Sequence, residues 1–230
     1  MNLNADLNEK ATARIGDLAW QPSPLKGVER RMLDREGGEV ARATTIVRYA
    51  PESFFDPHTH GGGEEFLVLQ GTFSDEHGDY PAGMYVRNPI GSAHKPFSEK
   101  GCTILVKLQQ MDAADQTYVR IDTNKGNWRP GAMIGVDIQP LHRFGAERVA
   151  MVRLSPGAII DHHAHPGGVE LLIVDGAVEH SGQTYTAQSW LRFPPGETHD
   201  LASAQGALLF AKVGHLKGEE ATGSNLLSAA

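Results

Sequence analysis

FFDPHTHGGGEEFLVLQG occupies residues 54–71, and IIDHHAHPGGVELLIVDG occupies residues 159–176. The two stretches align without gaps at an offset of 105, and eight of their eighteen positions are identical. The same offset relates four later pairs, namely Arg87 and Arg192, Pro89 and Pro194, Gly91 and Gly196, and His94 and His199. Similarity kept at one offset over this length indicates an internal duplication. The chain is therefore predicted to hold two copies of one domain.

The duplication sets the expected boundaries within the 230 residues. We place the first copy at residues 15–112 and the second at 123–217. Residues 113–122 are expected to link the copies. Residues 1–14 and 218–230 are polar and are expected to form tails.

Each copy consists of short stretches rich in β-branched and apolar residues, such as TTIVRYA and EFLVLQGTF. Turn residues separate them about every ten positions, and the chain contains 26 Gly and 13 Pro. This spacing is typical of an all-β sandwich or barrel. No stretch keeps a helical apolar period over three turns. The sequence predicts an all-β protein of two antiparallel β-barrels.

Composition excludes several classes of function. With 21 Lys and Arg against 28 Asp and Glu, the net charge is −7, which disfavours binding to nucleic acid. No apolar run is long enough to span a membrane, and the first residues lack the pattern of a secretion signal, so we expect a soluble, cytoplasmic protein with no membrane partner. The single cysteine, Cys102, excludes a zinc finger and is expected to be buried as a small apolar side chain.

Histidine carries the candidate chemistry. Alternate side chains of a strand share a face, so a His-x-His pair presents two imidazoles side by side. Each copy has such a pair, then a carboxylate, and about thirty residues later a third histidine in a Pro-x-Gly-x-x-His context. Three imidazoles and a carboxylate suit a divalent ion, and we expect Fe(II) or Zn ahead of Mn, Ni or Cu. An octahedral ion would keep two positions open for a substrate.

These residues resemble the cupins, whose two motifs are G(X)5HXH(X)3-4E(X)6G and G(X)5PXG(X)2H(X)3N. The first copy matches them at His58, His60, Glu64, Gly71, Gly83, Pro89, Gly91 and His94. Residues 61–108 are similar in particular to the cupin domain of the ChrR-type anti-sigma factors. The resemblance covers nearly the whole chain and implies two tandem jelly-roll barrels, a bicupin. It also implies a metal held in the first copy by His58, His60, Glu64 and His94.

The ChrR-type proteins also carry a zinc-binding helical domain that grips the sigma factor, and this sequence has no counterpart of its His and CxxC pattern. The resemblance therefore implies the barrel and its metal but not the anti-sigma role. Two positions depart from the cupin motifs in the first copy, where Glu52 and Ser98 replace a Gly and an Asn. In the second copy, Gln188 replaces a motif Gly.

The position of the carboxylate is ambiguous. Motif spacing selects Glu64, yet the gapless self-alignment sets Glu65 opposite Glu170 and leaves Val169 opposite Glu64. Neighbouring strand residues face opposite sides, so only one of Glu64 and Glu65 can reach a metal unless a bulge intervenes. The second copy either uses Glu170 through a shifted strand or is a three-histidine or degenerate site. Its predicted ligands are His163, His165, Glu170 and His199.

Other polar residues are interpreted as structural. Arg87 and Arg192 are expected to form surface or inter-barrel ion pairs, and contact with an anionic substrate is the alternative. The run DEHGD at residues 75–79 predicts a solvated turn. His162 is expected to face away from its neighbour His163 in a regular strand.

Three functions remain open from the sequence. The first is a metal-dependent dioxygenase that cleaves a diketone or hydroxyketone, with His58, His60, Glu64 and His94 as catalytic residues and an apolar lining of Phe66, Val68 and Leu105. The second is a regulatory cupin that senses a ligand or oxidant and signals to a partner protein. The third is an isomerase or decarboxylase. In each case the partner is a small molecule, and we expect a homodimer.

Overall fold

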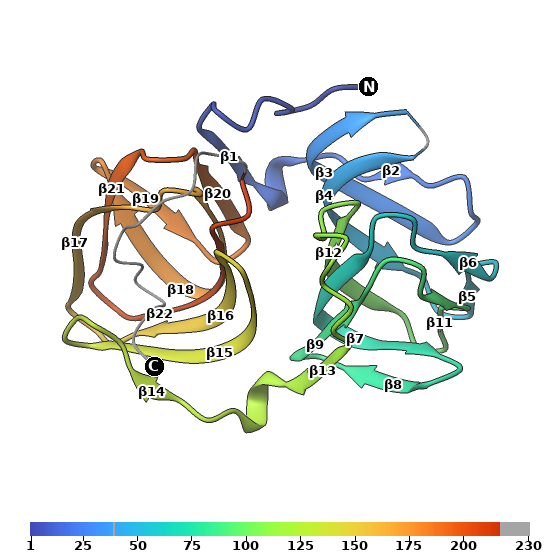
Figure 1. The fold of residues 1–230 in the computed structure, drawn as a ribbon. Helices are drawn as coiled ribbons and strands as arrows, with labels where there is room; N and C mark the ends of the chain where they lie inside the picture. Colours follow the sequence, from blue (N-terminus) through green and yellow to red (C-terminus); the bar gives the residue numbers. More distant parts are fainter. Residues whose placement is uncertain (39, 217–230) are drawn as a thin grey trace. The chain divides into compact units, whose positions relative to one another are not determined.

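The computed structural model describes residues 1–38 and 40–216, and it is built almost wholly from β-strands (Figure 1). This confirms the predicted all-β class. Within the described residues the helical segments are two 3-10 turns, Ile15–Asp17 and Thr123–Lys125. No described helix has the length and apolar character needed to cross a membrane. The tail predicted at 218–230 lies outside the described residues.

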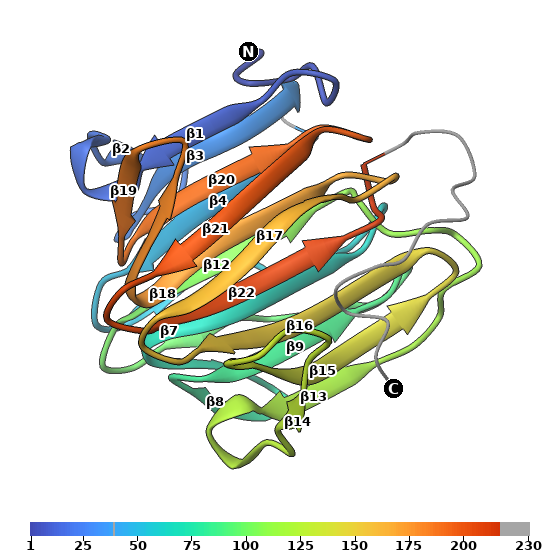
Figure 2. The ribbon, with the colours of Figure 1, turned by 90° about the vertical axis from the view of Figure 1, so that its left-hand side faces the viewer.

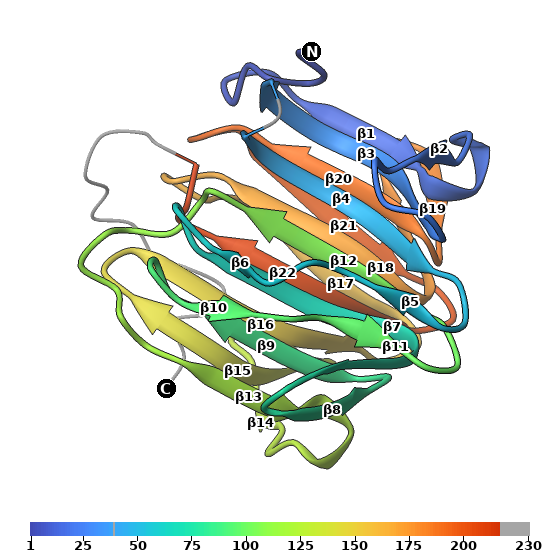
Figure 3. The same ribbon diagram turned by 90° about the vertical axis from the view of Figure 1, so that its right-hand side faces the viewer.

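The chain divides into two compact units. The first unit comprises residues 1–5 and 18–125. Its strands are β2 (Gln21–Pro22), β3 (Val28–Gly37), β4 (Ala41–Tyr49), β5 (Ser53–Phe54), β6 (His58–Thr59), β7 (Glu64–Asp75), β8 (Gly78–Pro81), β9 (Met84–Asn88), β10 (Ala93–His94), β11 (Phe97–Ser98), β12 (Cys102–Leu108) and β13 (Val119–Asp122). The main sheet has the order β13-β9-β7-β12-β4-β3-β2, while β10 pairs with β6 separately (Figure 3).

The second unit comprises residues 6–17 and, of those described, 126–216. Its strands are β1 (Ala11–Arg14), β14 (Arg129–Pro130), β15 (Val136–Phe144), β16 (Glu147–Leu154), β17 (Ala158–Ala164), β18 (Val169–His180), β19 (Gln183–Thr186), β20 (Ser189–Phe193), β21 (Thr198–Ser203) and β22 (Ala207–Val213). The order β1-β20-β18-β22-β16-β15-β14 repeats that of the first unit (Figure 2). Each unit is a jelly roll, as the sequence predicts.

One long strand organises each unit. The first half of β7 pairs with β9 and β12, whereas its second half pairs with β8 and β11. The strand turns at Gly71, which has φ +73°, and a Cβ there would lie 2.1 Å from the backbone oxygen of Gly101. Gly176 in β18 has φ +74° and the same close approach to Gly206. A side chain is excluded at both positions, so the two glycines let the strand serve both layers.

The edge strands differ from the predicted boundaries. Residues 11–14, which the sequence places in a tail, form β1 and pair with β20 of the second unit. Residues 119–122, which the sequence places in the linker, form β13 and pair with β9 of the first unit. The second unit is thus completed by β1, which precedes the first copy in the chain, and the first unit is completed by β13, which precedes the second copy. Composition does not reveal this exchange, because both segments are short and polar.

The core of each unit lies between its layers. Phe66 and Val68 belong to the core cluster of the first unit, together with Ile104 and Val106 of β12. Leu105 does not, because side chains alternate along a strand and its neighbours point inward. Leu105 is nevertheless buried, at 3% exposure, and its predicted place in the lining of the site stays a prediction.

Cys102 is a buried member of the first unit's core cluster, as the composition predicts. Burial raises the pKa of its thiol to about 11, so the thiolate is scarce near neutral pH. The structure therefore gives this cysteine a packing role.

The two aligned arginines are both fully buried but have different partners. Arg87 forms ion pairs of 2.6 Å with Glu65 and 2.7 Å with Asp115, but these pairs are buried within the first unit, so the predicted surface or inter-barrel location is wrong. Arg192 instead donates to the backbone oxygens of Asp6 and Glu9. Each guanidinium group can be buried because the fold supplies it with hydrogen-bonding partners.

Candidate metal centres

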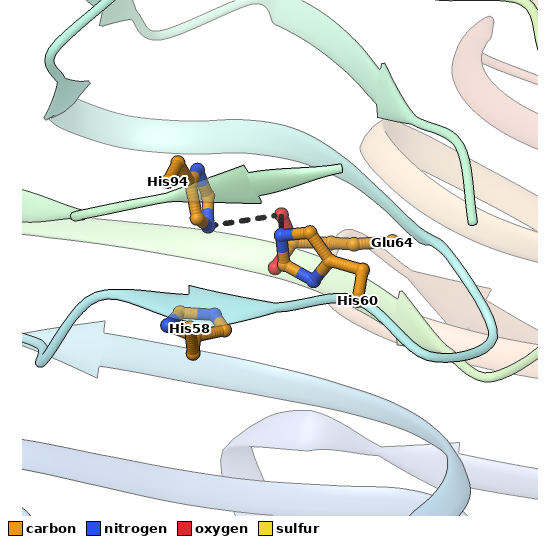
Figure 4. Close-up of side chains that lie close together, drawn as sticks. All are labelled: His58, His60, Glu64 and His94. Carbon is orange, nitrogen blue, oxygen red and sulfur yellow. Dashed lines mark ion pairs between the residues drawn. The ribbon is translucent and has the colours of Figure 1, made fainter. Parts of the chain in front are cut away.

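Four side chains of the first unit converge at one point, and we call them the first site: His58, His60, Glu64 and His94 (Figure 4). One donor atom from each lies within 4.8 Å of the others. His58 and His94 are direct partners across the β6–β10 pair. The His58 and His60 rings are 5.0 Å apart, as expected for alternate residues on one face.

The hydrogen bonds at the edge of the first site orient its rings. His58 Nδ1 donates to the backbone oxygen of Asp56 at 2.9 Å, and His94 Nδ1 donates to the Asp75 carboxylate at 3.0 Å. Each donation leaves Nε2 with a lone pair for a cation. Among the described residues, the buried Nε2 atoms of His60 and His94 have no hydrogen-bond partner.

Glu64 is the carboxylate of the first site, which answers the ambiguity between the two glutamates. Its Oε2 lies 3.5 Å from Nε2 of both His60 and His94, and it accepts a 3.0 Å hydrogen bond from Asn88. Glu65 faces the opposite side and binds Tyr85 and Arg87. The strand alternates regularly here, so motif spacing identifies the residue correctly.

Asp75 is a functional neighbour that the sequence did not identify. The run 75–79 was predicted to be a solvated turn, and residues 76–79 are exposed, but Asp75 is buried. Although burial acts to raise the pKa of Asp75, its hydrogen bonds to the His94 ring, the backbone N–H of His77 and the Tyr80 hydroxyl hold that pKa below the usual value. Although burial lowers the pKa of His94, Asp75 and Glu64 together raise it. Only the fold reveals the pairing, because 19 residues separate the two side chains.

These residues fit a divalent cation. Two buried imidazole nitrogens have no hydrogen-bond partner among residues 1–38 and 40–216, and the Glu64 carboxylate oxygen lies 3.5 Å from each of them. Buried polar atoms normally have partners, and three imidazoles with one carboxylate form a familiar donor set for divalent transition metals. The first site is therefore arranged as a metal-binding site of the cupin type.

Three side chains of the second unit converge in the same way, and we call them the second site: His163, His165 and His199. Their donor atoms also lie within 4.8 Å of one another. His163 pairs with His199 across β17 and β21, and its Nδ1 donates to the backbone oxygen of Asp161 at 2.8 Å. His162 is exposed and outside the cluster, in keeping with the prediction.

The structure does not bring Glu170 to these three histidines. The side chain of Glu170 lies 3.3 Å from Nε2 of His215, on the side of the strand that corresponds to Glu65. Val169 occupies the position of Glu64 and lies in the apolar core. No register shift separates Val169 and Glu170 in their pairing with β20 or β22, so the shifted strand considered from the sequence is absent there. Glu170 therefore does not complete the second cluster.

Two further polar positions of the first site also change in the second. The aligned pairs, first unit before second, are Glu64 and Val169, Asn88 and Phe193, and Asp75 and His180. The Phe193 ring stacks on His199 with centroids 4.1 Å apart. His180 donates instead to Asp200, and its Nε2 accepts a 2.7 Å hydrogen bond from Lys10. The second site has thus lost both carboxylates that contact the first.

The histidines of the second site have lowered pKa values, in keeping with the loss of these carboxylates. Burial and the neighbouring imidazoles lower the pKa of His165 to about 3, and burial with His163 lowers that of His199 to about 4. A cavity of about 30 Å³ adjoins the three rings. Its other lining residues are apolar: Val136, Ile138, Val152, Ile160, Val169, Leu171, Leu201, Leu209, Ala211 and Val213. The second site is therefore a neutral three-imidazole cluster in an apolar chamber.

Solved structures share this architecture at low sequence identity. A candidate dioxygenase from Nostoc punctiforme superposes with a TM-score of 0.77 at 14% identity, covering 94% of this chain and 86% of that one. YlbA from E. coli gives 0.68 at 13%, covering 94% and 95%. The oxalate decarboxylase of Lactobacillus farciminis, in a formate complex, gives 0.63 at 11%, covering 90% and 87%. These similarities concern the fold.

A comparison with curated protein sequences returns no match. The family model of the ChrR cupin-like domain, however, matches twice, at residues 8–112 and 116–217. The first match includes β1, which the structure assigns to the second unit. The second match includes β13, which the structure assigns to the first unit. The chain therefore belongs to the ChrR cupin-like family, as a bicupin with two copies of the domain.

Proposed function

We propose that the protein is a metal-dependent oxygenase whose first site holds Fe(II) and acts on a small diketone or hydroxyketone. The observation that carries the proposal is the convergence of three imidazoles and Glu64, with two imidazole nitrogens that have no hydrogen-bond partner among the described residues. The structural similarity to a candidate dioxygenase supports the same class. The second site lacks the carboxylate, so the chemistry is assigned to the first.

The residues of the first site would have different roles in holding the metal. His58, His60 and His94 would supply neutral nitrogen ligands, and Glu64 would supply the negative charge. Iron held there would supply Lewis acidity and a redox couple for reaction with dioxygen. Asn88 holds the Glu64 carboxylate, so that one oxygen stays directed at the histidines.

The surroundings of the first site favour an apolar substrate and exclude water. Tyr49, Phe66 and Phe73 are buried in the same core, and the Phe73 ring lies 6.0 Å from that of His94. Burial and the nearby Glu64 raise the pKa of Tyr49 well above its usual value, so its hydroxyl stays neutral. Uncharged side chains that keep water away strengthen the electrostatic interactions at the histidines.

The proposal is tested by anaerobic loading of the full chain with Fe(II), followed by oxygen-uptake assays on a panel of diketones and hydroxyketones. We expect uptake with at least one member, and its loss in His60→Ala. His77→Ala is the matched control, because His77 is exposed and outside the cluster. No uptake across the panel would contradict the oxygenase. Carbon dioxide release from a dicarboxylate without oxygen consumption would assign a decarboxylase instead.

A sensing role is the second candidate, favoured by the family itself. Both copies match the ChrR cupin-like domain, which supports a regulatory interpretation of the metal site. In that case the protein holds its metal without turnover and binds a partner protein in a metal-dependent way. Affinity capture with the metal-loaded and chelator-treated full chain, with and without peroxide, tests this. Recovery of the same proteins in every state would contradict it.

A further inference from the structure

We propose that the second site binds a divalent metal ion together with a small monovalent anion, such as formate or azide, which supplies the charge that Glu64 supplies in the first site. The inference concerns His163, His165 and His199 and is independent of the oxygenase proposed for the first site. It predicts that anion and metal bind cooperatively there. In the first site, by contrast, the metal needs no added anion.

The donors of the second site are prepared for a cation. His165 and His199 are 3% and 2% exposed, and the buried Nε2 of His163 has no hydrogen-bond partner among the described residues. His163 Nδ1 is already committed to the backbone oxygen of Asp161, as His58 Nδ1 is to Asp56. The imidazole that faces the cluster is thus held in the form that binds a metal.

The second site lacks a carboxylate among its donors, because the nearby Asp200 is partly exposed and bonds His180 instead. A dication buried among neutral ligands carries an uncompensated charge, which costs several kcal/mol or more in an apolar environment. Glu64 and Asp75 reduce that cost in the first site, but Val169 and His180 stand at those positions in the second. An anion that enters with the metal restores one negative charge at the same place.

The structure leaves room for such an anion beside the rings. The cavity of about 30 Å³ is bounded by the three histidines and by Val169, at the position where the first site has its carboxylate. Because one water needs about 10–15 Å³ of such space, the cavity suits a group of two or three heavy atoms. A larger ligand would clash with the apolar wall.

A fixed positive charge near the second site also favours an anion. Lys10 donates a 2.7 Å hydrogen bond to His180 Nε2, and its Nζ lies 4.8 Å from the centre of the Phe193 ring, which itself stacks on His199. Glu197 lies 3.9 Å from the same Nζ and offsets this charge only partly, since both groups are about one-third exposed. The first site also has a nearby cation, since Arg120 donates a 2.6 Å hydrogen bond to Asn88, but there Glu64 and Asp75 already supply negative charge.

The test isolates the second site within the full chain. In a His58→Ala/His60→Ala background, Co(II) is titrated in a buffer free of coordinating anions and again with azide, and its visible absorption reports binding. We expect azide to tighten Co(II) binding by about tenfold or more, because it neutralises a buried charge. Equal affinity with and without azide, or no Co(II) binding under either condition, would overturn the proposal.

Substitutions at Val169 sharpen this test. Val169→Glu restores the missing carboxylate, so Co(II) binding is expected to become independent of azide. Val169→Gln has the same size without the charge and is expected to keep the dependence. If both variants fail to fold by circular dichroism, the converse change decides: Glu64→Val, with His163→Ala/His165→Ala, is expected to make the first site dependent on azide. Persistent independence of azide in that variant would contradict the charge argument.

Discussion

The two candidate metal centres have the same backbone arrangement around their histidines, but the charges of the neighbouring side chains differ. In both, the leading histidine and the third histidine face each other across paired strands, and the leading histidine donates Nδ1 to the backbone oxygen two residues earlier. The first site adds Glu64 and Asp75, whereas the second has an apolar wall and a nearby lysine. The comparison teaches that duplication preserved the ligand geometry while three neighbouring positions changed the electrostatics.

The packing of the second site is the part of this comparison that affects stability most. Phe193 is fully buried and stacks on His199, so Phe193→Ala is expected to lower the free energy of unfolding by about 3–5 kcal/mol through loss of apolar burial and cavity formation. The counterpart Asn88→Ala removes a buried hydrogen bond to the Glu64 carboxylate and one from Arg120, which is exposed and can bond water instead, so we expect a cost of about 1.5–3 kcal/mol. Urea denaturation of metal-free protein measures both. A smaller loss for Phe193→Ala than for Asn88→Ala would contradict this contrast.

The Asp75–His94 pair gives the next effect. Asp75→Asn keeps the shape but removes the charge that orients His94, and we expect the affinity of the first site for its metal to fall about 10–100-fold. Competition with a chromogenic chelator measures the change. His180→Gln, at the aligned position of the second unit, is the control and should leave the affinity of the first site unaltered. Equal effects of the two variants would show that Asp75 has no special role.

The smallest effect is a difference in proton binding by the metal-free protein. His94 has a raised pKa, while those of His165 and His199 are lowered to about 3 and 4, burial being the largest cause of the lowering. Between about pH 6.5 and 4, His94 is therefore expected to carry a proton and the other two to remain neutral. Histidine NMR titration of chelator-treated protein, assigned with single His→Gln variants, checks this. A common midpoint for the three would contradict it.

The sign of the stability change follows from linkage. The unfolded chain binds protons at His165 and His199 near pH 6.5, but the folded chain does not, so their contribution is complete above about pH 6.5 and is lost as pH falls toward 4 and 3. His94 acts oppositely, because its raised pKa gives stability below about pH 6.5 that is lost as pH rises through the folded value. Hydrogen exchange of β21 and β10 would separate these trends.

Much of the fold and of the first site was predictable from the sequence. The offset of 105 predicts two copies, the turn spacing predicts strands, and alternation predicts that His58 and His60 share a face. Motif spacing then identifies Glu64 correctly. These features are local in sequence, which is why pattern alone suffices for them.

The features that sequence did not predict depend on contacts distant in the chain. Asp75 lies in a run of polar residues, and its burial against His94 depends on the turn of β7 at Gly71. The exchange of β1 and β13 between the units leaves no compositional mark. Glu170 was included because it aligns with Glu65, although Val169 is the true counterpart of Glu64 in space. A difference of one residue in strand register therefore decides whether the second site is assigned a carboxylate.

The most direct test is metal content after dialysis against buffer free of coordinating anions. The wild type, His60→Ala and the matched control His77→Ala are loaded with Fe(II) anaerobically and measured by elemental analysis. The first site, with its own carboxylate, is expected to retain about one ion per chain in the wild type and in His77→Ala, and none in His60→Ala. Unchanged metal content in His60→Ala would contradict the assignment of the first site.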